Sequence, residues 1–103
     1  MPKTTSKRDS RVTVIKALAH PTRLQLAEAL RGDGVCCVGE LHARVGGDLS
    51  TVSKHLSLMR DAGWIKSEKR GLHIHYSLAC DCLGEFLRCV DQLAATSNKE
   101  NCC

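Results

Sequence analysis

The amino-acid sequence predicts a small, mainly α-helical domain that carries one β-hairpin. Apolar residues recur at helical spacing through residues 12–62, and the same period returns from Cys82 onward. Between these segments, residues 72–78 alternate between apolar and polar side chains, which is the pattern of a half-buried strand. A chain of 103 residues has room for one modest core, so we expect a single domain over residues 10–96.

Three helices are expected ahead of residue 46. The first ends at His20-Pro21, because a proline breaks one helix and suits the first position of the next. The second then runs from Pro21 to about Arg31, and Gly32-Asp33-Gly34 forms a turn. The third runs from about Val38 to Val45. The residues expected to point inward from the second and third helices are Leu24, Ala27, Leu30, Val38, Leu41 and Val45.

The stretch from Asp48 to Gly63 predicts a fourth helix with an unusual polar face. Asp48 suits the N-cap and Gly63 the left-handed position after the last turn. The expected buried stripe is Leu49, Val52, Leu56 and Met59, and the opposite face carries Ser50, Thr51, Ser53, Lys54, Ser57 and Arg60. Short hydroxyl groups near the N-terminus, followed by longer cations, suit a helix that reads base edges in the major groove and contacts phosphates. The alternative is an ordinary solvated amphipathic helix.

The predicted hairpin after this helix favours the DNA-binding interpretation. Its first strand begins at Trp64-Ile65, and its turn is expected at Lys69-Arg70-Gly71. A basic hairpin directly after a helix-turn-helix unit indicates a winged helix-turn-helix, whose wing contacts phosphate or the minor groove. The predicted partner is double-stranded DNA. The predicted DNA-binding residues are Ser50, Thr51, Ser53, Lys54, Ser57, Arg60, Lys69 and Arg70.

The last helix, from Cys82, has a wide apolar stripe formed by Leu83, Phe86, Leu87, Val90 and Leu93. A domain of this size leaves little further core for such a stripe to cover. We therefore assign these five residues to a homodimer interface, together with the first helix. Residues 97–103 are expected to form a cysteine-bearing tail.

Charge and cysteine content narrow the functional class. Fifteen Lys and Arg against eleven Asp and Glu give a net charge of +4, and residues 1–9 form a basic tail. No apolar run reaches the length of a membrane span and no secretory signal is visible, so we expect a cytoplasmic protein without a membrane partner. Seven cysteines should then stay reduced. Their grouping as Cys36-Cys37, Cys80-x-Cys82 and Cys102-Cys103 favours metal or redox chemistry.

The sequence resembles the ArsR/SmtB family of metal-responsive winged-helix repressors, in particular the arsenic-responsive type. The matching motifs are Ala17-Leu18-Ala19-His20-Pro21-Thr22-Arg23-Leu24, Ser50-Thr51-Val52-Ser53-Lys54-His55-Leu56 and His75-Tyr76-Ser77-Leu78. The resemblance covers roughly residues 10–95. It implies a homodimer that binds an inverted-repeat operator, represses transcription and releases DNA when a ligand binds.

The cysteines depart from the pattern of the resembled family. Arsenic-responsive members commonly carry Cys-Val-Cys-Asp-Leu-Cys at the start of the third helix. The matching stretch here is Cys37-Val38-Gly39-Glu40-Leu41-His42, which keeps only the first thiol, and an extra Cys36 precedes it. Other members bind zinc on the last helix through Asp, His and Glu. Zinc is not expected there in this chain, because residues 80–96 contain no histidine.

The adjacent pair Cys102-Cys103 leads the candidate inducer ligands. Neighbouring cysteines form a disulfide only in a strained ring, whereas both sulfurs can turn toward one soft ion. The resemblance makes trivalent arsenic or antimony the expected inducer, and no organic cofactor is expected. The third thiolate is predicted to come from Cys82, Cys89, or Cys36-Cys37 of either subunit. Cys80 and Cys89 have simple packing as an alternative role.

The sequence therefore predicts a DNA-binding repressor that a thiophilic metalloid releases from its operator. One alternative keeps the fold but makes the signal thiol oxidation or persulfide, with Cys36 or Cys37 bonding to a last-helix cysteine such as Cys89. Another is a small metal-buffering or redox protein that does not act on DNA. An enzyme is not expected, because no cysteine has acid and base groups arranged around it for catalysis.

Overall fold

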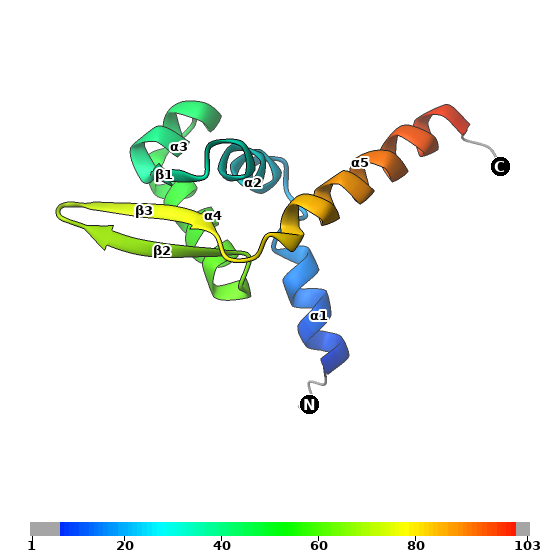
Figure 1. Cartoon of the computed structure of the whole chain (residues 1–103), viewed down its shortest axis with the longest axis horizontal. Coiled ribbons are helices and arrows are strands. Elements are labelled where there is room, and N and C mark those ends of the chain that lie inside the picture. The colour runs from blue at the N-terminus through cyan, green and yellow to red at the C-terminus, as the bar shows by residue number, and fades with distance from the viewer. Residues whose placement is uncertain (1–6, 101–103) are drawn as a thin grey trace.

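This computed structural model describes the backbone of residues 7–100 and the side chains of residues 10–96. Within residues 7–100 it contains five helices and three strands. In order they are α1 (Lys7–Lys16), α2 (Pro21–Asp33), β1 (Val35–Cys37), α3 (Val38–Val45), α4 (Leu49–Ala62), β2 (Ile65–Arg70), β3 (His73–Leu78) and α5 (Cys82–Glu100). Helices α2, α3 and α4 gather on one side of the hairpin, while α1 and α5 project from this body (Figure 1).

The helix-turn-helix unit lies where the sequence predicts it. Helix α3 has the predicted bounds, and α4 begins directly after Asp48 and ends before Gly63. Gly63 adopts a left-handed φ of 99°, and its N–H donates to the carbonyls of Arg60 and Met59. Glycine is suited to this conformation because it has no Cβ. Helix α4 therefore stops before the hairpin begins.

The sheet contains a strand that the sequence analysis missed. Its order is β1-β3-β2 with antiparallel pairing throughout, so β1 adds a third strand to the predicted hairpin. In β1, Val35 pairs with Ser77 and Cys37 pairs with His75. A strand of three residues is too short to show alternation. The sequence prediction assigned residues 35–37 to no element, because it placed the turn at Gly32-Asp33-Gly34 and the start of the third helix at about Val38.

The core is formed where α2, α3, α4 and the start of α5 meet the inner part of the sheet. Its fully buried large side chains are Leu26, Leu30, Leu41, Val52, Leu56, Met59 and Leu83. Two residues expected to be buried are instead partly exposed, Leu24 at 37% and Leu49 at 48%. In α2 the buried face contains Leu26 and Ala29 beside the predicted Ala27 and Leu30, so the helix is rotated relative to the prediction.

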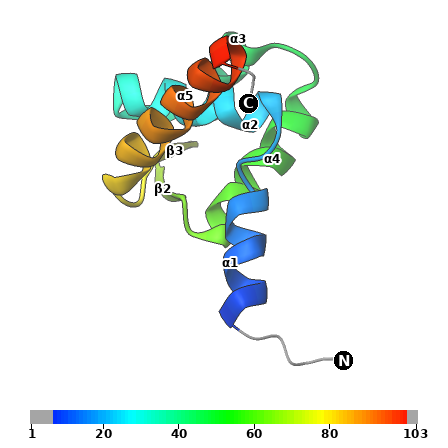
Figure 2. The ribbon, with the colours of Figure 1, turned by 90° about the vertical axis from the view of Figure 1, so that its right-hand side faces the viewer.

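Trp64 joins α1 and α5 to the start of the hairpin. Its indole Nε1 donates a hydrogen bond of 2.7 Å to the carbonyl oxygen of Val14 in α1. Its ring stacks on Phe86 of α5, with centroids 5.6 Å apart. A buried indole N–H normally finds an acceptor, and an aromatic pair adds packing energy. This junction fixes how the two projecting helices leave the body (Figure 2).

The hairpin turn lies one residue further along the chain than expected. Arg70 pairs with His73 across the two strands, so Gly71 and Leu72 form the turn, and Lys69 and Arg70 belong to β2. Gly71 has a positive φ of 64°, as tight hairpin turns require. Leu72 is 94% exposed rather than part of the buried alternation. The tip of the wing thus extends past the core.

The two chain ends differ from the predicted boundaries. Helix α1 starts at Lys7, inside the predicted basic tail, and α5 continues to Glu100, so residues 97–100 of the predicted cysteine-bearing tail are helical. Cys102 and Cys103 lie outside the described residues. Within residues 7–100, none of the helices has the length and hydrophobicity that crossing a bilayer requires.

Candidate nucleic-acid interface and thiol sites

The polar face of α4 carries the predicted DNA-binding side chains. Ser50, Thr51, Lys54 and Arg60 are exposed, whereas Ser53 and Ser57 are half-buried. The Asp48 carboxylate accepts hydrogen bonds from the hydroxyls of Ser50, at 2.6 Å, and Thr51, at 3.3 Å. These hydrogen bonds, with that of Ser50 first, hold the pKa of Asp48 below its usual value. The two hydroxyl groups at the start of the helix are therefore oriented by the Asp48 carboxylate.

The turn between α3 and α4 is held by a histidine. Gly46 and Gly47 both adopt positive φ values, 73° and 79°. The ring nitrogen Nε2 of His42 donates to the carbonyl oxygen of Gly47 at 2.7 Å. A turn fixed at both glycines and at His42 sets the angle at which α4 leaves α3. His42 thus has a structural role in this turn.

A histidine pair connects α4 to the start of α2. The Nδ1 atom of His20 accepts a hydrogen bond of 3.0 Å from the Thr22 amide and so caps α2. The His20 ring lies 4.5 Å from the ring of His55 on α4. Burial, followed by the neighbouring His20 and Arg23, lowers the pKa of His55. His55 is therefore neutral at neutral pH and packs against α2.

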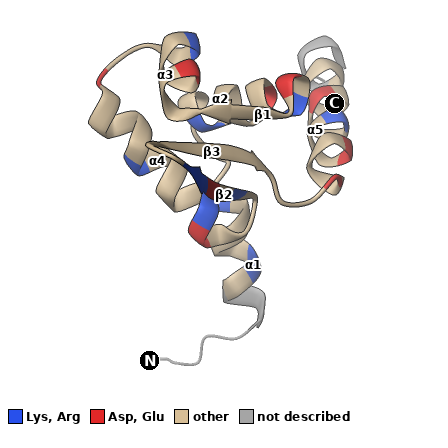
Figure 3. Cartoon of the chain, turned by 60° about the vertical axis from the view of Figure 1, so that its left-hand side comes forward, with Lys and Arg blue, Asp and Glu red and all other residues tan. Residues whose placement is uncertain are grey.

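One carboxylate, Glu68, lies among the three cations of the wing strand β2. Figure 3 shows basic and acidic residues side by side on β2. Arg70 donates to the Glu68 carboxylate at 3.1 Å, and both side chains are largely exposed. This pair was not predicted from the sequence, although residues two apart on a strand share a face. The predicted basic tip consequently carries less net positive charge than Lys69 and Arg70 alone would give.

Replacing Arg70 with alanine should weaken binding to all DNA sequences about equally. A cation that contacts a phosphate releases one counterion, so its loss should lower the slope of log K against log salt concentration by about one. Fluorescence anisotropy over a range of salt concentrations measures this slope. Glu68→Gln is the matched variant and should strengthen binding, because it frees Arg70. A change of sequence preference with an intact slope would show that Arg70 reads bases.

Cys36 is buried beside an acidic residue. Its Sγ lies 3.7 Å from Oδ2 of Asp33, which also forms an ion pair with Arg44. Burial, and then the charge of Asp33, raise the pKa of the Cys36 thiol. Cys36 therefore stays protonated near neutral pH and reacts slowly as a thiol. Its neighbour Cys37 is half-buried at the N-cap of α3, where its amide donates to Glu40 at 2.9 Å.

The expectation that all cysteines are reduced is wrong for one pair. Cys80 and Cys82 form a disulfide at the bend between β3 and α5. The bend brings their Cα atoms to 5.2 Å, within the usual range for disulfides. Cys82 was predicted as a possible metal ligand, and its sulfur is bonded to Cys80 instead. Cys89 is free and exposed on α5.

Cys36, Cys37 and Cys89, the predicted ligands whose free thiols are described, do not form a metal site among residues 10–96 of one chain. Among the residues whose side chains are described, no group of three or more His, Cys, Asp or Glu could hold an ion. Cys36 faces Asp33, while Cys89 lies on the exposed part of α5. A three-thiolate site therefore needs residues outside residues 10–96 or from a second subunit.

The apolar stripe of α5 is divided between the core and an exposed face. Leu83 and Leu87 are at most 2% exposed and belong to the core cluster, so assigning them to a subunit interface was wrong. Phe86 is half-buried against Trp64. Val90 is 37% exposed and Leu93 is 70% exposed. The helical period cannot separate these two surfaces, because both lie on one stripe.

Helix α1 also leaves apolar side chains exposed. Val12 is 46% exposed and Ile15 is 54% exposed. Together with Val90 and Leu93 of α5 they are the large apolar side chains left exposed on these two helices within residues 10–96. Apolar side chains left uncovered on both helices are typical of an association surface.

Comparison with known proteins agrees with this architecture. A helix-turn-helix domain model matches residues 18–68. The transcriptional regulator CmtR of Mycobacterium tuberculosis is 40% identical over 79 residues. The match covers 73% of this chain and 66% of CmtR, so the chain spans slightly less than two thirds of the length of that relative. The regulator MJ1325 of Methanocaldococcus jannaschii is 30% identical over 87 residues, 84% of this chain and 98% of that protein. The arsenical resistance operon repressor of Escherichia coli is 28% identical over 102 residues, 88% and 87% of the two chains.

Solved structures share the same fold. The crystal structure of Rv0081 from Mycobacterium tuberculosis has a TM-score of 0.84 at 28% identity and covers 93% of this chain and 96% of its own. The solution structure of Mb0332 from Mycobacterium bovis has a TM-score of 0.77 at 24% identity and covers 99% of this chain and 96% of its own. It is described as a homodimeric winged helix-turn-helix DNA-binding domain of a possible ArsR-family regulator. With its helix-turn-helix, its wing and these relatives, the chain belongs to the ArsR family of transcriptional regulators.

Proposed function

We propose that the protein is a homodimeric repressor that binds an inverted-repeat operator and releases it when a thiophilic metalloid binds its cysteine thiolates. The observation that carries the DNA-binding part is the hydroxyl-and-cation face of α4 beside an exposed wing. Ser50 and Thr51 lie at the N-terminal end of this helix, where base edges are reached. Lys54, Arg60, Lys69 and Arg70 serve the phosphates.

The dimer is supported by the exposed apolar residues of α1 and α5. Two inverted half-sites need a protein with two-fold symmetry, which places two copies of α4 one helical turn of DNA apart. Val12, Ile15, Val90 and Leu93 offer the apolar surface for this contact. The homodimeric domain of Mb0332 supports the same arrangement.

For the inducer we propose trivalent arsenic, trivalent antimony or a methylated arsenical. Cys102 and Cys103 supply two neighbouring thiols that can turn toward one soft ion. A third thiolate would come from Cys37, Cys36 or Cys89, in the same subunit or its partner. The Escherichia coli relative, an arsenical resistance operon repressor, supports a metalloid signal.

The deciding experiment is a footprint on the DNA upstream of the chain's own reading frame, carried out under reductant with and without arsenite. We expect two protected half-sites about one helical turn apart and loss of protection when arsenite is added. A reduced protein that protects no DNA would indicate the metal-buffering alternative. Protection that persists through titration with arsenite, antimonite and methylarsenite would reject the metalloid as the inducer.

A second candidate signal is thiol oxidation, which the Cys80–Cys82 disulfide favours. Two thiols form a disulfide when they give two electrons and two protons to an oxidant such as hydrogen peroxide, which is thereby reduced to water. The pair lies between the wing strand β3 and α5, so the redox state of this bend would act on both elements. Operator release by peroxide in the absence of any metalloid, with reversal by a dithiol, would support this candidate.

A further inference from the structure

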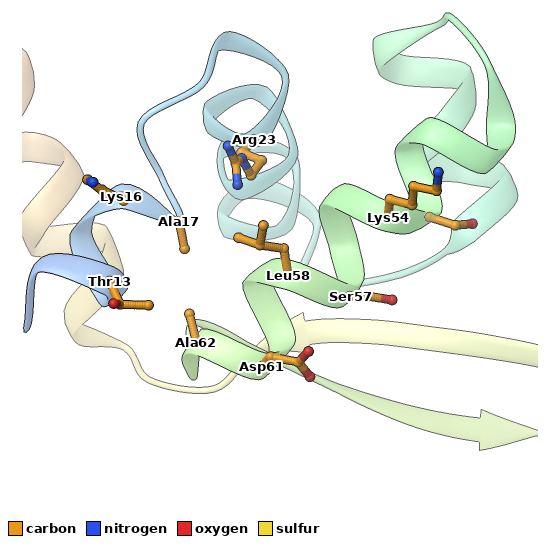
Figure 4. A pocket seen from close by; sticks show the side chains of 10 residues that line it. Thr13, Lys16, Ala17, Arg23, Lys54, Ser57, Leu58, Asp61 and Ala62 are labelled. Carbon is orange, nitrogen blue, oxygen red and sulfur yellow. The ribbon is translucent and has the colours of Figure 1, made fainter. Parts of the chain in front are cut away.

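A hollow of about 750 Å³ lies between α1, the start of α2 and α4. Figure 4 shows Thr13 and Lys16 from α1, Ala17 directly after it, Arg23 from α2, and Ser57, Leu58, Asp61 and Ala62 from α4 around this space. Its lining combines the apolar side chains Ala17, Leu58 and Ala62 with three hydroxyl groups, one carboxylate and the three cations Lys16, Arg23 and Lys54. This arrangement would suit an anionic group.

Arg23 is the central feature of the hollow. Its side chain is half-buried, and its Nε is a buried donor without a hydrogen-bond partner among the described residues. The neighbouring imidazole of His55 does not neutralise it, because burial, His20 and the charge of Arg23 lower the pKa of His55. The Nε donor of Arg23 therefore lacks an acceptor among the described residues, and the planar arrangement of guanidinium donors matches phosphate geometry.

The charges around the hollow favour an anion from outside the protein. Lys16 and Lys54 add two cations from two other helices. Among the described residues lining the hollow, Asp61 is the one carboxylate, and its Oδ1 lies 3.6 Å from Nη2 of Arg60. Positive charge therefore exceeds negative charge in this space, and the hollow can attract phosphate.

The position of the hollow identifies the source of the phosphate. Ser53, Lys54 and Ser57 line it and also belong to the polar face of α4. A helix that lies in the major groove has a phosphate strand running along its flank. We infer that the hollow binds a backbone phosphate of DNA, with Arg23 as the principal donor and with Lys16 and Lys54 beside it. This inference rests on the proposed DNA-binding function.

The consequence is that α1 takes part in DNA binding. Lys16 lies on the same helix as Val12 and Ile15, whose exposed side chains we assign to the dimer contact. A phosphate in the hollow would therefore contact α1, α2 and α4 together. DNA binding would fix α1 against α4, and so would connect the subunit contact to the recognition helix.

The test measures binding to a random-sequence DNA duplex over a range of salt concentrations, by fluorescence anisotropy with the full-length chain. Arg23→Gln should lower the slope of log K against log salt by about one, and should weaken binding about eightfold at about 0.1 M salt. Arg31→Gln is the matched control, because it changes the charge equally on the same helix and lies outside the hollow. Its slope should equal that of the unmodified chain.

A second measurement covers the case in which Arg23→Gln fails to fold. The Nε–Hε signal of Arg23 in the unmodified chain should shift in an NMR titration with the same duplex. An unshifted signal, or a wild-type slope in a folded Arg23→Gln variant, overturns the inference. So does a signal that moves with inorganic phosphate but not with duplex, because the site would then take a free anion. If the unmodified chain binds no duplex at all, the proposed function fails and this inference falls with it.

Discussion

Replacing Val90 with aspartate is expected to convert the protein to a monomer that no longer protects an operator. Val90 is 37% exposed on the part of α5 beyond the core. A two-fold interface contains each substituted residue twice, so two carboxylates would be buried against apolar surface at a cost of several kcal/mol for each. Light scattering should report the monomer mass, and footprinting should show the lost protection.

Leu72→Asp is the matched control for this substitution. Leu72 is also an exposed apolar residue, but it lies at the wing tip and is 94% exposed. This variant should remain dimeric. Phe86→Asp is a poorer test, because Phe86 stacks on Trp64 and its loss would also disturb the fold. A Val90→Asp protein that stays dimeric at the concentration where the unmodified protein is dimeric would contradict the interface.

The helix-turn-helix unit could be predicted because the residues that begin and end its helices act on their immediate neighbours in the sequence. A proline at position 21, the glycines at 46 and 47 and Gly63 each act within one turn of a helix end, so sequence alone places them. Strand β1 could not be predicted in this way. Val35–Cys37 becomes a strand only because β3 pairs with it, and that partner lies far along the chain.

The division of α5 shows a second limit. Leu87 and Val90 are one helical turn apart on a single apolar stripe, yet the first is buried in the core and the second is partly exposed. Periodicity reports which residues prefer burial. It does not report whether the chain itself or a partner covers them, because this depends on tertiary packing, such as the stacking of Trp64 on Phe86 at the start of α5.

The sequence predicts the DNA-binding residues of α4 better than the residues around Arg23, because only the former lie on a single element. The polar residues of α4 share one helix face, so spacing places them together. Arg23 is a single cation in α2, and only the packing of three helices places it beside Lys16 and Lys54. The close spacing of Cys80 and Cys82 permits a disulfide between them. This disulfide was not predicted, because the sequence suggests a cytoplasmic protein and cysteines normally stay reduced in the cytoplasm.

Cys102→Ser and Cys103→Ser should each abolish release of the operator by arsenite while leaving repression intact. Each substitution removes one of two neighbouring thiolates from the proposed soft-ion site. Coupling between an inducer and DNA typically amounts to about 5–150-fold in affinity, and all of it should disappear. Operator affinity without inducer should stay near the wild-type value, because the last turns of α5 extend away from α4 and the hairpin (Figure 1).

The choice of site can be tested with three further variants, with operator release as the readout; the two tests with metalloid are carried out under strict reductant, and the third, with peroxide, is carried out without it. Cys89→Ser removes one candidate for the third thiolate, so partial loss of release would place Cys89 in the site and full release would favour Cys36 or Cys37. A chain that ends at Asn101 should not respond to arsenite, antimonite or methylarsenite. If the shortened chain still releases DNA, the inducer binds at Cys36 and Cys37 instead. If peroxide releases DNA from the Cys102→Ser, Cys103→Ser double variant, the signal is oxidation, and Cys80 with Cys82 becomes the pair to replace next.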